Sequence, residues 1–151
     1  AIGLSRSTGA TAVALVGASS AVGRVGIGHL ADRVGRLGVF VACSAVMGLA
    51  TLWLVPAATV PGLYAFAVVF GLGYGGNGAL ISPLTADLFG RANINAVFGL
   101  VSMAFAIAGL VAPPAAGATF DAVGSYDPAF LVTGVAALVG AGGVALAGRL
   151  A

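Results

Sequence analysis

The chain has 151 residues, of which 60% are hydrophobic and only 7% are charged, with a formal net charge of +2. Soluble domains carry about 25% charged residues, so a soluble protein of this size could not cover its surface with so few charges. Six arginines without any lysine are too few positive charges for a nucleic-acid-binding surface, so no nucleic-acid partner is expected.

Five apolar stretches have about the length of a membrane-spanning helix, which needs about 20 residues. They are too long for ordinary strands, and they lack the strict alternation of strands or of a membrane barrel. Short turns separate them, which makes neighbouring helices antiparallel. The predicted fold is an all-α, polytopic membrane bundle of five helices, at about residues 9–28, 38–56, 62–86, 94–117 and 129–148.

Charge asymmetry predicts how this bundle is oriented. In an antiparallel arrangement, one side carries five arginines: Arg24, Arg33, Arg36, Arg91 and Arg149. The other side carries Arg6, Asp121 and Asp127. Because the arginine-rich side of a membrane protein is normally cytoplasmic, the sequence predicts a multi-pass protein of the inner (plasma) membrane with its arginine-rich loops inside the cell.

The glycine-rich first stretch also permits a soluble alternative, a nucleotide-binding dehydrogenase. Gly17 and Gly23 fit part of one dehydrogenase glycine pattern, and residues 26–31 fit G-x-G-x-x-A. Such a motif needs an acidic residue about 20 positions later, and residues 47–49 are uniformly apolar there. The dehydrogenase alternative is therefore disfavoured.

Residues 28–36 read Gly-His-Leu-Ala-Asp-Arg-Val-Gly-Arg and match the pattern G-x-x-x-D-R-x-G-R. This closely resembles the cytoplasmic loop that joins the second and third helices of each half of a major facilitator superfamily transporter. Only the last basic position of that loop departs, being Leu37 here. The competing interpretation is a simple basic turn beside the membrane.

The resemblance extends along the chain through Gly23-Arg24, "GLGYGGNG", "DLFGRAN" and "APPAAGATFDAVGSYDPAF". It is most similar to the monocarboxylate and oxalate–formate porter branch and aligns the five spans with helices eight to twelve, in the C-terminal half. Since the chain begins with Ala1 and not Met, we expect a piece of a longer protein whose N-terminal half is a partner of this one.

The resemblance implies a secondary active transporter that moves a small solute by alternating access, with a small organic acid as one candidate. Efflux of a neutral or amphipathic compound is the alternative. The expected partners are the small-molecule solute, the lipid bilayer and the N-terminal half. No enzymatic activity, catalytic residue, metal or cofactor is expected.

In this family the helix that corresponds to the third span lines the central cavity. Phe70, Tyr74 and Asn77 share one face of that span and are the candidate cavity residues. For Asn77 a hydrogen bond to another helix is the favoured alternative to solute contact, because intramembrane amides need partners. In the fourth span, Pro113 and Pro114 are expected either to form a gate hinge or to end the helix.

The loop motif and the third turn together predict a cytoplasmic gate. Its candidate residues are Gly28, Asp32, Arg33, Gly35, Arg36, Asp87 and Arg91. Their charges are expected to form a network that holds the cytoplasmic side closed. Alternatively, these charges act only as topology signals.

Arg24 is expected to lie too close to the cytoplasmic turn to reach a solute. No charge is then predicted at the middle depth of any span. If the solute is an anion, its charge would have to be met by the rest of the protein.

Overall fold

A computed structural model of the chain describes residues 6–56 and 59–150. It contains five helices in the order α1 (Arg6–Val34), α2 (Arg36–Leu54), α3 (Val60–Phe89), α4 (Ile94–Val123) and α5 (Asp127–Leu150). All five are long and apolar enough to cross a membrane. The prediction of an all-α polytopic membrane bundle is confirmed.

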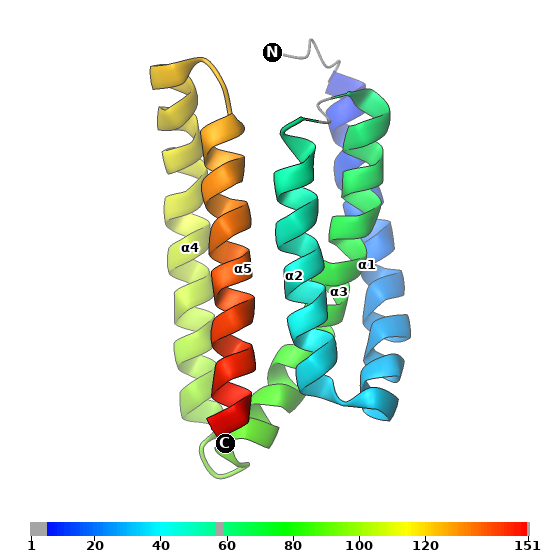
Figure 1. The fold of residues 1–151 in the computed structure, drawn as a ribbon, viewed down its shortest axis with the longest axis vertical. Coiled ribbons are helices and arrows are strands. Elements are labelled where there is room, and N and C mark those ends of the chain that lie inside the picture. Colours follow the sequence, from blue (N-terminus) through cyan, green and yellow to red (C-terminus); the bar gives the residue numbers. More distant parts are fainter. Residues whose placement is uncertain (1–5, 57–58, 151) are drawn as a thin grey trace.

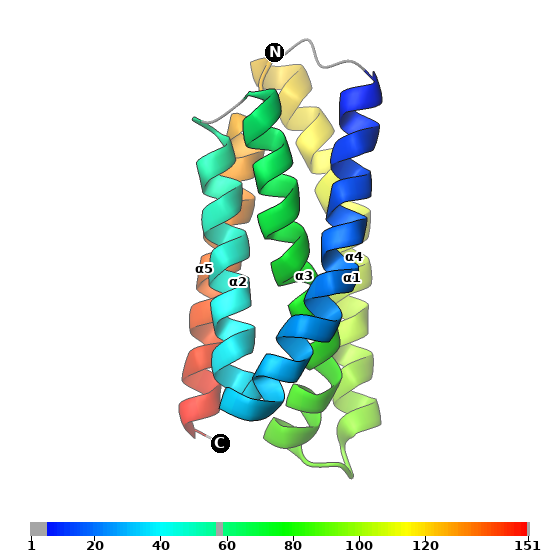
Figure 2. The same ribbon diagram turned by 90° about the vertical axis from the view of Figure 1, so that its right-hand side faces the viewer.

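The helices run up and down beside one another (Figures 1 and 2). The α1–α2 turn, the α3–α4 turn and the end of α5 lie at one end of the bundle, at the bottom of Figure 1. The start of α1 and the α4–α5 turn lie at the opposite end. The α1–α2 turn, which carries the motif, and the α3–α4 turn, which follows Asp87, are therefore neighbours in space.

Four of the five helices extend beyond the predicted spans, most clearly α1 at its end, whereas α2 starts and ends two residues earlier than predicted. α1 continues six residues past Gly28 to Val34, and α2 starts at Arg36. Only Gly35 separates them, with a φ of 108° that side chains other than glycine's rarely tolerate. The motif is thus a helix end with a one-residue turn, whereas the sequence predicted a loop between spans that end near residue 28 and begin near residue 38.

Two prolines lie inside α4 without ending it. Pro113 and Pro114 are followed by nine further helical residues, as far as Val123. The expectation that they terminate the helix was wrong, because proline removes one backbone hydrogen bond while the surrounding turns continue. Their role as a hinge stays a prediction.

The backbones of α1 and α3 approach each other closely along a line of small residues. A Cβ atom added at Gly71 would lie 2.7 Å from the carbonyl oxygen of Val16, and one added at Gly75 would lie 2.8 Å from the carbonyl carbon of Ser20. In lipid, helices associate through such close packing, because their surroundings are as apolar as they are. These glycines therefore permit the α1–α3 contact.

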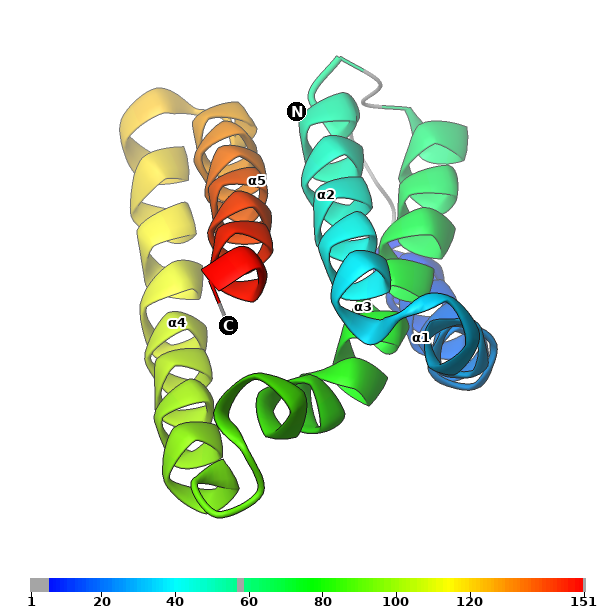
Figure 3. The ribbon, with the colours of Figure 1, turned by 60° about the horizontal axis from the view of Figure 1, so that its bottom comes forward.

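A second set of small residues joins α2 to its neighbours. Gly73 on α3 faces the carbonyl oxygen of Cys43, and Gly48 on α2 faces the carbonyl oxygen of Gly134 on α5. By contrast, none of the residues of α4 is buried. Figure 3 shows the last turns of α3 leading away from α2 toward the start of α4. This arrangement leaves α4 apart from α1 and opens a space between them.

We expect Gly75→Ala to destabilise the bundle by about 1–3 kcal/mol, because the new methyl group would overlap the backbone of α1 at Ser20. Thermal unfolding in detergent measures this effect. Gly143→Ala is the matched control, since nothing lies within 4 Å of a Cβ added there. It should leave stability unchanged or slightly raised, because alanine favours helix. Equal effects of the two substitutions would contradict the proposed role of Gly75.

Candidate functional site

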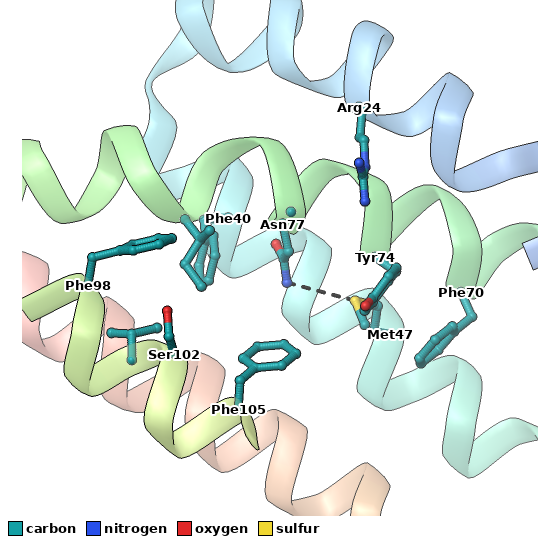
Figure 4. A pocket seen from close by; sticks show the side chains of 12 residues that line it. Arg24, Phe40, Met47, Phe70, Tyr74, Asn77, Phe98, Ser102 and Phe105 are labelled. Carbon is teal, nitrogen blue, oxygen red and sulfur yellow. Dashed lines mark hydrogen bonds between the residues drawn. The ribbon is translucent and has the colours of Figure 1, made fainter. Parts of the chain in front are cut away.

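A cavity of about 450 Å³ lies between α1, α2, α3 and α4 (Figure 4). Five aromatic side chains dominate its wall, and the polar groups come from an arginine, a tyrosine, an asparagine and a serine. The lining residues are Arg24, Phe40, Met47, Phe70, Tyr74, Asn77, Gly78, Ile81, Phe98, Val101, Ser102 and Phe105. A mostly apolar pocket with a few convergent polar groups is the usual form of a small-molecule site.

The three cavity residues predicted from the sequence all reach this wall. Phe70, Tyr74 and Asn77 line the cavity from one face of α3. The rings of Phe70 and Tyr74 stack, with centroids 6.2 Å apart and planes 11° apart. Their contact with a solute stays a prediction, but their placement allows it.

Asn77 also makes the interhelical hydrogen bond that was the alternative interpretation. Its Nδ2 donates to Ser44 Oγ at 2.9 Å, and Ser44 Oγ in turn donates to the carbonyl oxygen of Phe40 at 2.9 Å. Because the serine proton is used on Phe40, Ser44 must accept from Asn77, which fixes the orientation of the amide. Oδ1 of Asn77 is then buried without a partner among the described residues.

Arg24 lies in the cavity wall, which corrects the expectation that it sits too near the cytoplasmic turn. α1 runs from Arg6 to Val34, so Ser20 is its midpoint and Arg24 lies about 6 Å further along. Figure 4 shows its side chain extending from α1 toward α3. Nε and Nη2 lie 3.8 and 3.9 Å from the position of a Cβ at Gly78, so this glycine leaves room for the guanidinium.

The charge of Arg24 has no carboxylate partner in the part of the chain that the structure describes. Of the four aspartates of the sequence, Asp32 and Asp87 pair with Arg36. The other two lie at or near the ends of α4 and α5, by the α4–α5 turn. The cavity is therefore positively charged, and an anion would be attracted to it.

Three of the predicted gate charges meet at the end of the bundle that carries the α1–α2 turn. Nε and Nη2 of Arg36 donate to Oδ1 of Asp32 at 3.1 and 3.0 Å. Nη1 donates to Oδ2 of Asp87 at 3.0 Å. Since these carboxylates belong to α1 and α3, Arg36 at the start of α2 links three helices. Asp32, Arg36 and Asp87 together form what we call the Arg36 clamp.

The other predicted gate residues lie outside this clamp. Arg33 and Arg91 are exposed and form no ion pair with any residue between 6 and 56 or between 59 and 150. Gly35 forms the turn, whereas a Cβ at Gly28 would only touch Ala79 at 3.7 Å, an ordinary contact. Alanine would therefore fit at position 28, and no close helix approach depends on this glycine.

The sequence missed several lining residues besides Arg24. Phe40 and Met47 come from α2, on which no cavity residue was predicted. Phe98 and Phe105 come from α4, where only Pro113 and Pro114 were singled out from the sequence. These side chains reach one cavity only because α2 packs against α3 and α4 lies apart from α1.

Comparison with known proteins agrees with this architecture. A family model described as Major Facilitator Superfamily matches residues 1–149. Monocarboxylate transporter 12 of Mus musculus is 33% identical over 139 residues, which are 89% of this chain and 29% of that protein. Monocarboxylate transporter 10 of Danio rerio is 33% identical over 131 residues, or 85% and 26% of the two chains. The agnestins efflux protein AgnL12 of Paecilomyces divaricatus is 33% identical over 128 residues, or 85% and 29%.

Five membrane-length helices, four of which line a mostly apolar cavity, define a multi-pass membrane protein. The chain belongs to the major facilitator superfamily, a family of transporters. It spans less than a third of the length of the curated relatives it matches. No solved structure matches it.

We expect Ser44→Ala to destabilise the bundle by about 1–3 kcal/mol, because it leaves the Asn77 amide without its best partner. Asn77→Leu should recover much of this loss when added to Ser44→Ala, since it removes the unpaired groups altogether. A double-mutant cycle of thermal unfolding in detergent measures the coupling. Strictly additive effects would mean that the bond contributes nothing to stability.

Proposed function

We propose that this chain is part of a secondary active transporter that moves small organic anions by alternating access. The observation that carries the proposal is the guanidinium of Arg24, which lies without a carboxylate partner in the wall of an aromatic cavity near the middle of α1. Charged residues at this depth are costly and typically mark a solute path. A carboxylate would form a charge-assisted, bidentate pair with Arg24.

Two kinds of support converge on an anion. No aspartate or glutamate lines the cavity, so its only formal charge is positive. Two of the relatives are named monocarboxylate transporters. The second candidate is efflux of a neutral or amphipathic compound, which the aromatic wall and the relative named as an agnestins efflux protein favour.

The same proposal includes the partners and the orientation. The open face of α4, which has no buried residue, would pack on an N-terminal half of the transporter and complete the cavity around the solute. The bundle would lie in the lipid of the inner (plasma) membrane. The Arg36 clamp and Arg91 would lie at its cytoplasmic face, as the positive-inside rule predicts.

Alternating access requires contacts that hold one state and are absent from the other. The Arg36 clamp joins the end of α1, the start of α2 and the end of α3 at one face of the bundle. The side chains of Arg36, Asp32 and Asp87 are 37%, 60% and 51% exposed, so the clamp adds little to overall stability. Its proposed role is to bias the closed cytoplasmic state.

We expect Arg24→Gln in the complete transporter to reduce uptake of organic anions at least tenfold, because the cavity loses its only formal charge. Arg24→Lys should retain part of the activity, since the charge remains while the bidentate geometry is lost. Uptake of a labelled monocarboxylate into proteoliposomes measures both.

Arg149→Gln is the control for Arg24→Gln, because it removes the same charge from the end of α5, away from the cavity. It should leave uptake unchanged. Full anion uptake by a folded Arg24→Gln transporter would overturn the anion proposal and favour the neutral or amphipathic solute.

We expect Asp32→Asn to slow turnover and to shift the transporter modestly toward its inward-facing state, because the clamp is exposed to solvent. Losing one carboxylate leaves Arg36 bound to Asp87 alone and loosens α1 from the clamp. The measurement combines uptake rate with the reactivity, from the cytoplasmic side, of a cysteine introduced at Ser102 in a Cys43→Ser background.

Asp121→Asn removes a carboxylate near the opposite end of the bundle and should change neither uptake nor reactivity. Unchanged rate and reactivity in Asp32→Asn would leave the clamp as a topology signal only.

In the same assay, a cysteine placed at Arg33 should react with an impermeant reagent only from the cytoplasmic side. Reaction from outside would reverse the proposed orientation.

A further inference from the structure

A second, smaller cavity adjoins the one described above. Its volume is about 390 Å³, and its wall consists of Val16, Gly17, Ser20, Ala21, Arg24 and Tyr74. Arg24 and Tyr74 belong to both cavities. The guanidinium of Arg24 therefore stands where the two spaces meet, and a single solute touching it could extend into both.

Two adjacent serines on α1 differ sharply in their surroundings. The hydroxyl of Ser19 is used entirely on backbone, since it donates to the carbonyl oxygen of Leu15 and lies 3.3 Å from that of Ala67 on α3. The hydroxyl of Ser20 forms no hydrogen bond with any residue of the described chain, although the residue is only 7% exposed and lines the smaller cavity. Helical serines commonly bond their own backbone, so an unused hydroxyl at this place is unusual.

Ser20 and Arg24 are four residues apart on α1 and share one face of it. Gly17 and Ala21, which complete that face, add no bulk and no charge. A hydroxyl and a guanidinium on consecutive turns suit the two oxygens of one carboxylate. Both groups donate hydrogen bonds, and neither carries a negative charge that would repel the carboxylate.

The larger cavity offers a different environment on the other side of Arg24. Phe40, Phe70, Phe98 and Phe105 line it, and its only formal charge is Arg24 itself. Figure 4 shows Phe105 and Ser102 facing α3 across the space below Tyr74. A second carboxylate there would have no cation to pair with, whereas an apolar or aromatic group would be removed from water.

We propose that Ser20 and Arg24 together bind the carboxylate in the smaller cavity, while an apolar tail of the same solute lies among the phenylalanines of the larger one. The inference rests on the proposed function, which it narrows to monocarboxylates with an apolar tail. It makes Ser20 a specificity-determining residue and fixes which end of the solute faces α1.

The test measures how well four acids inhibit the uptake of a labelled monocarboxylate by the complete transporter in proteoliposomes. The acids are acetate, butyrate, phenylacetate and 3-phenylpropionate. Each added methylene should lower the inhibition constant about threefold to fourfold, from the apolar surface that enters the larger cavity. Ser20→Ala should raise the inhibition constants of all four acids by a similar factor, about tenfold. Phe105→Ala should flatten the dependence on tail length and leave acetate unchanged.

Ser19→Ala is the matched control for Ser20→Ala. It removes a hydroxyl that bonds only backbone, so it should lower thermal stability without changing any inhibition constant. Phe105 is 61% exposed, so its truncation should not unfold the protein. A common factor for Ser20→Ala and a lost slope for Phe105→Ala, at unchanged melting temperature, would support the two-cavity arrangement.

Different failures point to different conclusions. If the transporter moves none of these acids and none of them inhibits it, the proposed function itself falls. If acids are transported but Ser20→Ala behaves like Ser19→Ala, Ser20 does not bind the carboxylate. If acetate binds as well as 3-phenylpropionate, or a dicarboxylate binds best, the larger cavity does not hold an apolar tail.

Discussion

The close approach of the α1 and α3 backbones is the constraint on which the rest of the structure depends. Gly71 and Gly75 carry no side chain where α1 crosses them, so backbone meets backbone near Val16 and Ser20. In a membrane, packing of this kind has to replace the hydrophobic effect that joins helices in water. A methyl group at either glycine would push α1 outward and change everything that α1 presents to the cavity.

The contact between α1 and α3 determines the surroundings of two arginines, Arg24 and Arg36. With α1 held against α3, Arg24 reaches past Gly78 into the cavity, where the described chain supplies no carboxylate. At the end of the same pair of helices, Asp32 and Asp87 come close enough for Arg36 to bond both. One cation is thus left available to a ligand, while the other is neutralised where three helices meet. The difference comes from where the four aspartates lie, since none of them lines the cavity.

The glycine-rich segment of α3 allows close packing against both α1 and α2. Gly71 and Gly75 face α1, while Gly73 faces α2. Tyr74, between these glycines, and Asn77, just after them, both line the cavity wall. Asn77 is tied to α2 through Ser44, so the cavity wall and the α2–α3 contact share a hydrogen bond. A change at this position would therefore affect both the α2–α3 contact and the cavity wall.

The sequence by itself determined that the chain is a five-helix membrane bundle of this transporter family, because apolar length and the motif at residues 28–36 are local properties. Helical spacing also placed Tyr74 and Asn77 on one face. Only the tertiary structure decided that Arg24 lies in the cavity, because α1 runs on through the motif to Val34 and so shifts its midpoint to Ser20. It also brought Phe40 and Phe105 to the same space, since side chains from different helices meet through packing that no local pattern encodes.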